Sequence, residues 1–165
     1  DPSRGVRLHR RPLGVTPRWV VDDLVTVQGP PHEVEAAVQR TAEADGKSIP
    51  ITIPQDPGQA GLAQVQHYQR KLDGWSVIPK RPDRKKELRR GPVSSQVGAH
   101  NVALVRAPWN AALVAEGHAA PDGPHDDILD ALADAHAELS ERVTVFEDSG
   151  QSYGAGHRRG SRRGR

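Results

Sequence analysis

The sequence predicts an α/β domain in which a β-sheet carries helices on its faces. Short apolar runs bounded by Gly or Pro alternate with longer stretches whose apolar residues recur at helical spacing, in the order β-β-α-β-α-β-α-β-α-α. No internal repeat divides the chain, and 165 residues give room for one domain with its own core. Because aromatic residues make up only 4% of the chain, that core must rest on Val, Ile, Leu and Ala.

The first half of the chain begins with two expected strands, residues 5–10 and 18–27, which are joined through Gly14. A helix is predicted over about 31–45, because apolar and small residues recur there at helical spacing on one inner face: Val34, Ala37, Val38 and Thr41. Residues 51–53 form a β-branched run between two prolines, which indicates a buried strand.

The second half continues the alternation. A helix is expected after Gly61, with its inner face at Leu62, Val65, Gln66, Gln69 and Leu72. Residues 75–78 and 102–105 are predicted as further strands, and a short helix opens at Pro108. The run 143–146 is compatible with an additional edge strand, although it is too short for its period to decide.

Three closely spaced Asp residues lie at the start of the last predicted helix. On a helix, Asp126 and Asp130 lie one turn apart on one face, with Asp127 beside them. The apolar positions that face inward on the same helix are Ile128, Leu129 and Leu132. Because like charges so close repel one another, we expect a cationic group nearby. The alternative is simple N-terminal capping, since Asp in the first turn complements the helix dipole.

Asp56 is a second acidic candidate. It falls just past the C-terminal end of the 51–53 strand, where open α/β sheets place their ligands. This is a suitable position for a metal-binding carboxylate. The alternative is an ordinary Asp-Pro-Gly turn in which Asp56 caps the next helix, and the two interpretations are compatible.

The composition excludes several kinds of site and segment. The chain has no Cys, which excludes disulfides and thiolate metal sites and leaves carboxylates as the natural ligands for a hard metal ion. No apolar stretch approaches the roughly 18 residues of a membrane span, and no signal-peptide pattern opens the chain. These features agree with a cytosolic protein.

The net charge of +2 hides an asymmetry. Five arginines lie in the final stretch: Arg158, Arg159, Arg162, Arg163 and Arg165. Removing these five from the 23 Lys and Arg leaves 18 against 21 Asp and Glu, so the body is acidic. The Gly/Arg-rich tail, residues 147–165, is expected to be disordered and to attract phosphate by charge, or else to be a solvated terminus without function.

A second basic run is internal: Lys80, Arg81, Arg84, Lys85, Lys86, Arg89 and Arg90. It is the better candidate for DNA contact, although a solvated helix face explains the pattern almost as well.

Two other features are weaker indications of function. Gly46-Lys47-Ser48 imitates the end of a phosphate-binding loop but lacks the upstream Gly and lies between a helix and a strand. Among the eight His residues, only His125 stands beside the acidic pair, where it can help to position a water or phosphate.

The motifs along the chain, in their order and spacing, resemble the C-terminal nuclease domain of tailed-bacteriophage terminase large subunits over about residues 18–140. They are Pro54-Gln55-Asp56-Pro57-Gly58-Gln59-Ala60-Gly61, Lys86-Glu87, Arg89, Gln96, Asn101-Val102, Leu104-Val105-Arg106, Trp109-Asn110, His125-Asp126-Asp127 and Asp130-Ala131-Leu132. The resemblance implies an RNase H-like mixed sheet with helices on both faces and an acidic cluster that binds Mg²⁺ or Mn²⁺ and cuts concatemeric double-stranded DNA.

On this analogy Asp56 matches the second metal-binding acid of the family, and the pair Asp126-Asp127 matches the third. Asp130 would orient a metal ligand or a metal-bound water, and His125 would help to position a water or phosphate. We expect the DNA backbone to be contacted by basic residues of the internal run and of the tail: Lys85, Lys86, Arg89, Arg90, Arg158, Arg159, Arg162 and Arg163. The resemblance also names double-stranded DNA, the portal protein and the terminase small subunit as partners, in the cytoplasm of a bacterial host.

The departures from the family concern its first strand, which is central and carries the first metal-binding Asp. Residues 5–10 and 18–27 match the second and third strands of the family, and neither Asp22 nor Asp23 stands at a catalytic position. Leu62 also replaces a usual Lys. We therefore expect residues 1–146 to form a nuclease domain incomplete at its N-terminus, with the 51–53 strand central and Asp56 within about 8 Å of Asp126 or Asp127. The alternative is an inactive prophage remnant or a DNA- or portal-binding module.

Overall fold

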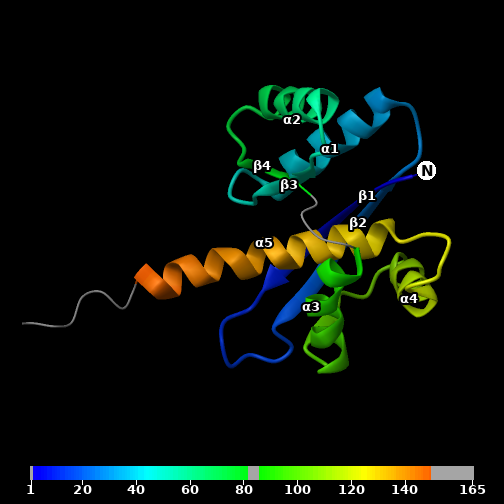
Figure 1. Cartoon of the computed structure of the whole chain (residues 1–165), viewed down its shortest axis with the longest axis vertical. Helices are drawn as coiled ribbons and strands as arrows, with labels where there is room; N and C mark the ends of the chain where they lie inside the picture. Colours follow the sequence, from blue (N-terminus) through cyan, green and yellow to red (C-terminus); the bar gives the residue numbers. More distant parts are fainter. Residues whose placement is uncertain (1, 82–85, 150–165) are drawn as a thin grey trace, which may run out of the picture.

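The computed structural model describes residues 2–81 and 86–149, and within them the side chains of all but 86–89 and 142–149. The elements follow the predicted order: β1 (Ser3–Arg10), β2 (Trp19–Val27), α1 (Pro31–Asp45), β3 (Ile51–Pro54), α2 (Gln59–Lys71), β4 (Val77–Lys80), α3 (Lys86–Gly98), β5 (Val102–Leu104), α4 (Asn110–Ala119) and α5 (Asp127–Ser149). Figure 1 shows α5 running across β1 and β2, with α1, α2, β3 and β4 above it and α3 below. The α/β class is confirmed.

A bulge in the β1-β2 hairpin gives its two faces different chemistry. The antiparallel register shifts between Arg7 and Leu8, so that Asp22 is an extra residue on β2. The faces of β1 alternate: Leu8 packs against the core, whereas Arg7 pairs with Asp22 and with Asp45 at the end of α1. α5 packs on the core face of β1, whereas α1 contacts β2 and reaches the other face of the hairpin through Asp45. Helices therefore lie on both faces of the sheet, as predicted.

The sheet is divided into two parts. One is mixed, in the order β1-β2-β5, with β2 parallel to β5. The other is the parallel pair of β3 and β4. The prediction that residues 51–53 form a central strand is therefore wrong: β3 bonds to β4 along one edge, and no described strand bonds along its other edge. A strand becomes central only when ladder partners lie on both sides, and β1 likewise has β2 on one side alone within the described residues.

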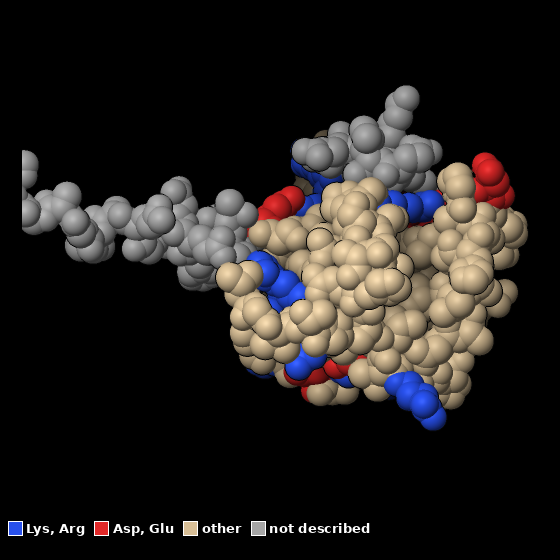
Figure 2. All heavy atoms as spheres, turned by 90° about the horizontal axis from the view of Figure 1, so that it is seen from below, with Lys and Arg blue, Asp and Glu red and all other residues tan. Residues whose placement is uncertain are grey.

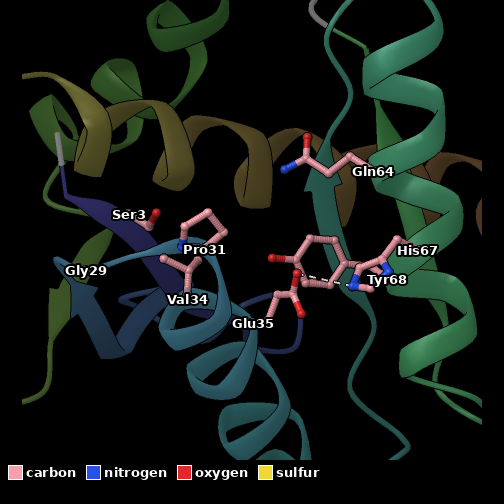
Figure 3. A pocket seen from close by; sticks show the side chains of 8 residues that line it. All are labelled: Ser3, Gly29, Pro31, Val34, Glu35, Gln64, His67 and Tyr68. Atoms are coloured by element: carbon pink, nitrogen blue, oxygen red, sulfur yellow. Dashed lines mark ion pairs between the residues drawn. The ribbon is translucent and has the colours of Figure 1, made fainter.

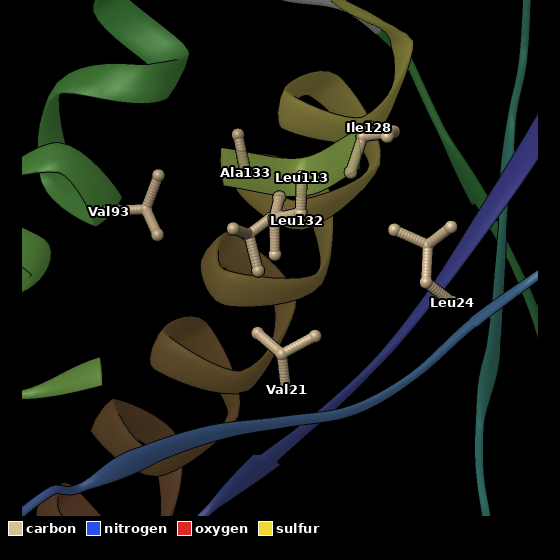
Figure 4. Packing of buried hydrophobic residues seen from close by; sticks show 7 residues of the cluster. All are labelled: Val21, Leu24, Val93, Leu113, Ile128, Leu132 and Ala133. Carbon is tan, nitrogen blue, oxygen red and sulfur yellow. The ribbon is translucent and has the colours of Figure 1, made fainter. Parts of the chain in front are cut away.

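The main core joins α5 to the mixed sheet. Figure 4 shows the side chains converging from β2, α3, α4 and α5. They are Val21, Leu24, Val93, Leu113, Ile128, Leu132 and Ala133. The predicted inward positions of α5 are confirmed, with Ile128 only 1% exposed and Leu129 packed at the edge of the cluster. Burial of these side chains fixes which face of α5 turns outward.

A smaller core lies between α1, α2 and the β3-β4 pair. Its buried members are Ala42, Tyr68 and Leu72. The predicted inner face of α2 is partly wrong, because Leu62, Gln66 and Gln69 are exposed and the buried stripe is Gly61, Val65 and Tyr68. Lys47 belongs to the Gly46-Lys47-Ser48 run that imitates a phosphate-binding loop, and its Nζ lies 4.7 Å from the centre of the Trp75 ring. This cation–π contact gives the lysine a structural role.

His136 is buried where α5 packs on β2. Its ring centre lies 4.2 Å from that of Trp19, and Arg10 lies over the same indole at 5.5 Å. The described residues give His136 Nε2 no hydrogen-bond partner. Burial, and the positive charge of Arg10, lower the pKa of His136 below its usual value.

The chain end differs from expectation in one respect. α5 continues to Ser149, so residues 143–146 are helical and the edge-strand alternative is wrong. The first three residues assigned to the basic tail, 147–149, belong to this helix. The arginines of the tail lie outside the described residues. None of the described helices is both long and apolar enough to cross a membrane.

Candidate functional site

The candidate site lies at the start of α5. Asp126 immediately precedes the helix, and its carbonyl oxygen accepts the hydrogen bond of the Asp130 amide at 2.9 Å. Asp127 is the first helical residue. All three carboxylates are partly exposed. Because Ile128 and Leu132 are held in the core, the face that carries Asp126 and Asp130 is fixed relative to the rest of the fold.

The cap of α5 comes from another helix. Oε1 of Glu116, on α4, accepts the backbone amides of Ile128 and Leu129 at 2.8 and 3.0 Å. These are the donors that an N-cap side chain of the same helix usually satisfies. Asp127 and Asp130 do lie in the first turn, where their charge complements the helix dipole as the capping alternative expects, but the acceptor of these two amides is Glu116. Glu116 is 8% exposed, and sequence reasoning missed it; the only signal was that Glu116 is the one acidic residue of α4.

Arg90 is the cationic group that the clustered acids required. From α3 its Nη2 lies 2.7 Å from Oδ2 of Asp126 and 2.6 Å from Oδ1 of Asp130, and Nε donates to the same Asp130 oxygen at 2.8 Å. Burial alone would lower the pKa of Arg90, but its hydrogen bonds to Asp126 and Asp130 outweigh burial and raise it. The expectation of a nearby cation is confirmed.

Asp56 lies in the loop between β3 and α2, and its side chain is exposed. It does not cap α2, since the N-cap residue is Gly58 and no side chain caps that helix. The loop is held close to the helix at Gly61, where a Cβ atom would overlap the carbonyl oxygen of Asp56. The neighbouring Gln55 amide donates to the Lys80 carbonyl at 2.8 Å, which ties the loop to β4. The close approach of Asp56 to Asp126 or Asp127 stays a prediction.

The donor chemistry of these acids suits a hard metal ion, because carboxylate oxygens are the ligands that Mg²⁺ and Mn²⁺ prefer. Their number is small. Among the side chains that the structure describes, no three His, Asp or Glu side chains gather as a metal site would. Mg²⁺ is often held by one or two carboxylates together with water and phosphate oxygens. The pair Asp126-Asp127 supplies two carboxylates, and metal binding by them stays a prediction.

The remaining predicted residues are placed as follows. His125 is exposed and directly precedes Asp126. Lys86 and Arg89 belong to the first turns of α3, whereas Lys85 and the tail arginines lie outside the described residues. On the face shown in Figure 2, Lys and Arg form separate small groups, some of them beside Asp or Glu, and no continuous basic patch. The DNA-binding residues therefore stay predictions.

A second acidic group, on the opposite face of the hairpin, is structural. Asp22 accepts hydrogen bonds from Arg7 at 2.8 Å and pairs with His9 at 2.7 Å. Burial would raise the pKa of Asp22, but the hydrogen bonds from Arg7 and His9 lower it below its usual value.

A hollow of about 310 Å³ lies between the start of β1, α1 and α2. Figure 3 shows Glu35 and Tyr68 at its wall, with Glu35 paired to His67. Hydrogen bonds from Lys71 and His67 lower the pKa of Glu35. None of the predicted site residues lines this hollow, so it is separate from the acidic site.

The fold and the site together define an α/β domain of RNase H-like type with carboxylates at the start of its last helix. The family model described as a terminase RNaseH-like domain matches residues 16–139. The chain therefore belongs to this family, and the resemblance seen in its motifs is confirmed. No curated protein sequence matches the chain.

Proposed function

We propose that this chain is a metal-dependent endonuclease domain of a phage DNA-packaging terminase, which cuts concatemeric double-stranded DNA in the cytoplasm of the bacterial host. The observation that carries the proposal is the acid pair Asp126-Asp127 in a chain of the terminase RNaseH-like family. Burial of Ile128 and the Glu116 cap fix the start of the helix that presents it. Such a defined position is what catalytic carboxylates need.

In this proposal Asp126 and Asp127 would hold Mg²⁺ or Mn²⁺, with Asp56 as a further ligand. When bound, the ion would activate a water and neutralise charge on the scissile phosphate. The positive end of the α5 dipole stabilises the negative charge of side chains at its start. Asp130 would orient the pair, and His125 is placed to contact water or phosphate.

DNA would be guided by the basic residues at the start of α3 and by the arginines of the tail. As a terminase domain, the chain would also work with the portal protein and the terminase small subunit.

A non-catalytic DNA- or portal-binding module is the second candidate. It is favoured by the divided sheet and by the absence of three gathered metal-ligand side chains in the part of the chain that the structure describes. A two-metal phosphodiesterase needs enough carboxylates to fix both ions against the attacking and leaving oxygens. On this ground we expect cleavage by the 165-residue chain to be slow.

The two candidates are separated by a plasmid-nicking assay in Mn²⁺ and in Mg²⁺, run beside a DNA-retention assay. For the nuclease, slow nicking should be lost in the double variant Asp126→Ala/Asp127→Ala. The matched control is Asp122→Ala, which removes an exposed acid from the loop just before the helix and should leave nicking unchanged. Retention of DNA without any nicking would support the binding module. Nicking that survives the double substitution would refute the assigned residues.

A further inference from the structure

We propose that Arg90 is an exchangeable counter-ion: its guanidinium occupies the acidic site when no metal is bound, and a divalent cation displaces it from Asp126 and Asp130. This inference rests on the proposed function, since it assumes that the acids bind metal. It adds that a side chain of the protein occupies the carboxylates in the resting site.

Arg90 contacts the carboxylates of Asp126 and Asp130 as a bound cation would. Its guanidinium reaches one oxygen of Asp126 and one of Asp130 at 2.6–2.8 Å, from a side chain that is only 12% exposed. Two positive groups cannot occupy the same carboxylates without strong repulsion. An ion bound by Asp126 must therefore compete with Arg90.

The acids remain open to solvent beside Arg90. The Asp126 side chain is 31% exposed and that of Asp130 is 21% exposed. A hydrated ion can thus approach the carboxylates from solvent while the guanidinium holds them from the protein side. Displacement then requires no opening of the core.

The fold does not depend on the carboxylate of Asp126 for the start of α5. Glu116 accepts the amides of Ile128 and Leu129, so the helix keeps its cap whichever cation Asp126 binds. α3 is likewise held independently of the ion pair, because Val93 is buried in the main core at 6% exposure. A displaced guanidinium is suited to bidentate contact with phosphate.

The first experiment measures Mn²⁺ affinity of the full chain by calorimetry for wild type, Arg90→Gln and Arg90→Lys. We expect about a tenfold gain for Arg90→Gln, because a single adjacent charge shifts carboxyl affinity for a proton by a similar factor or more. Arg90→Lys should stay close to wild type, since it keeps the charge. The matched control is Arg7→Gln, which also removes an arginine that bridges two carboxylates, on the opposite face.

The second measurement uses wild type and therefore does not depend on how well a variant folds. The Nε–H of Arg90, which donates to Asp130, should exchange with water at least tenfold faster when Mg²⁺ saturates the chain, as followed by NMR. If Mn²⁺ and Mg²⁺ bind but neither the exchange rate nor the affinity of Arg90→Gln changes, the inference is wrong and the metal site stands. If no ion binds to wild type or to Arg90→Gln, the proposed metal site itself is refuted, and the inference with it.

Discussion

Substitution of Glu116 by Ala tests whether α5 depends on a cap from α4. The change leaves the amides of Ile128 and Leu129 without their acceptor near the core. Loss of a helix cap costs about 0.5–2 kcal/mol, and a buried donor without a partner costs about 1–3 kcal/mol. Since the two estimates describe overlapping effects, we expect the free energy of unfolding to fall by about 2–3 kcal/mol.

Urea unfolding followed by circular dichroism measures this change directly. In a thermal melt, the melting temperature should fall by about 4–12 °C, given about 2–4 °C per kcal/mol for a chain of this length. Glu116→Gln keeps an oxygen acceptor and should lose less than about 1 kcal/mol, mainly the interaction of its charge with the helix dipole.

The control is Glu43→Ala, which removes an exposed glutamate from α1 and should change stability by less than about 0.5 kcal/mol. A loss for Glu116→Ala no larger than that of the control would refute the trans cap. Equal losses for the Ala and Gln variants would show that charge, not the hydrogen bonds, stabilises the helix start.

Three further predictions concern other parts of the chain. Because the pKa of buried His136 is lowered in the folded state, the contribution of neutral His136 to stability is complete above the unfolded value of 6.5 and is lost as the pH falls below it. Urea titrations between pH 5 and 8 should therefore show that the free energy of unfolding depends less on pH for His136→Phe than for wild type. An unchanged pH dependence would contradict this. Gly61→Ala should destabilise the chain by about 1–3 kcal/mol and displace the Asp56 loop, because the new Cβ meets backbone, whereas Gly117→Ala, which has open space, should be neutral or stabilising; thermal melts of both variants decide. Deletion of residues 157–165 should flatten the salt dependence of DNA binding, by about 0.9 in the log–log slope for each phosphate that the tail neutralises in the full chain, and an identical slope would show that the tail does not touch DNA.

The sequence alone determined the succession of elements and the orientation of the last helix. Periodicity is a local property, so the spacing of Ile128 and Leu132 was enough to place their face inward and Asp126 outward. The need for a cation beside the acids also followed from the sequence, because like charges one turn apart repel. The motif spacing was specific enough to indicate the family that the match over residues 16–139 confirms.

Only the tertiary structure decided which partners these residues have. Arg90 and Glu116 come from different helices, 36 and 12 positions from the groups they contact, and no local pattern connects them to α5. The division of the sheet was likewise invisible, because a β-branched run such as Ile51 to Ile53 looks the same whether one edge or both are paired. Side-chain periodicity reports burial of a face, whereas ladder partners, caps and ion pairs depend on which distant segments the fold brings together.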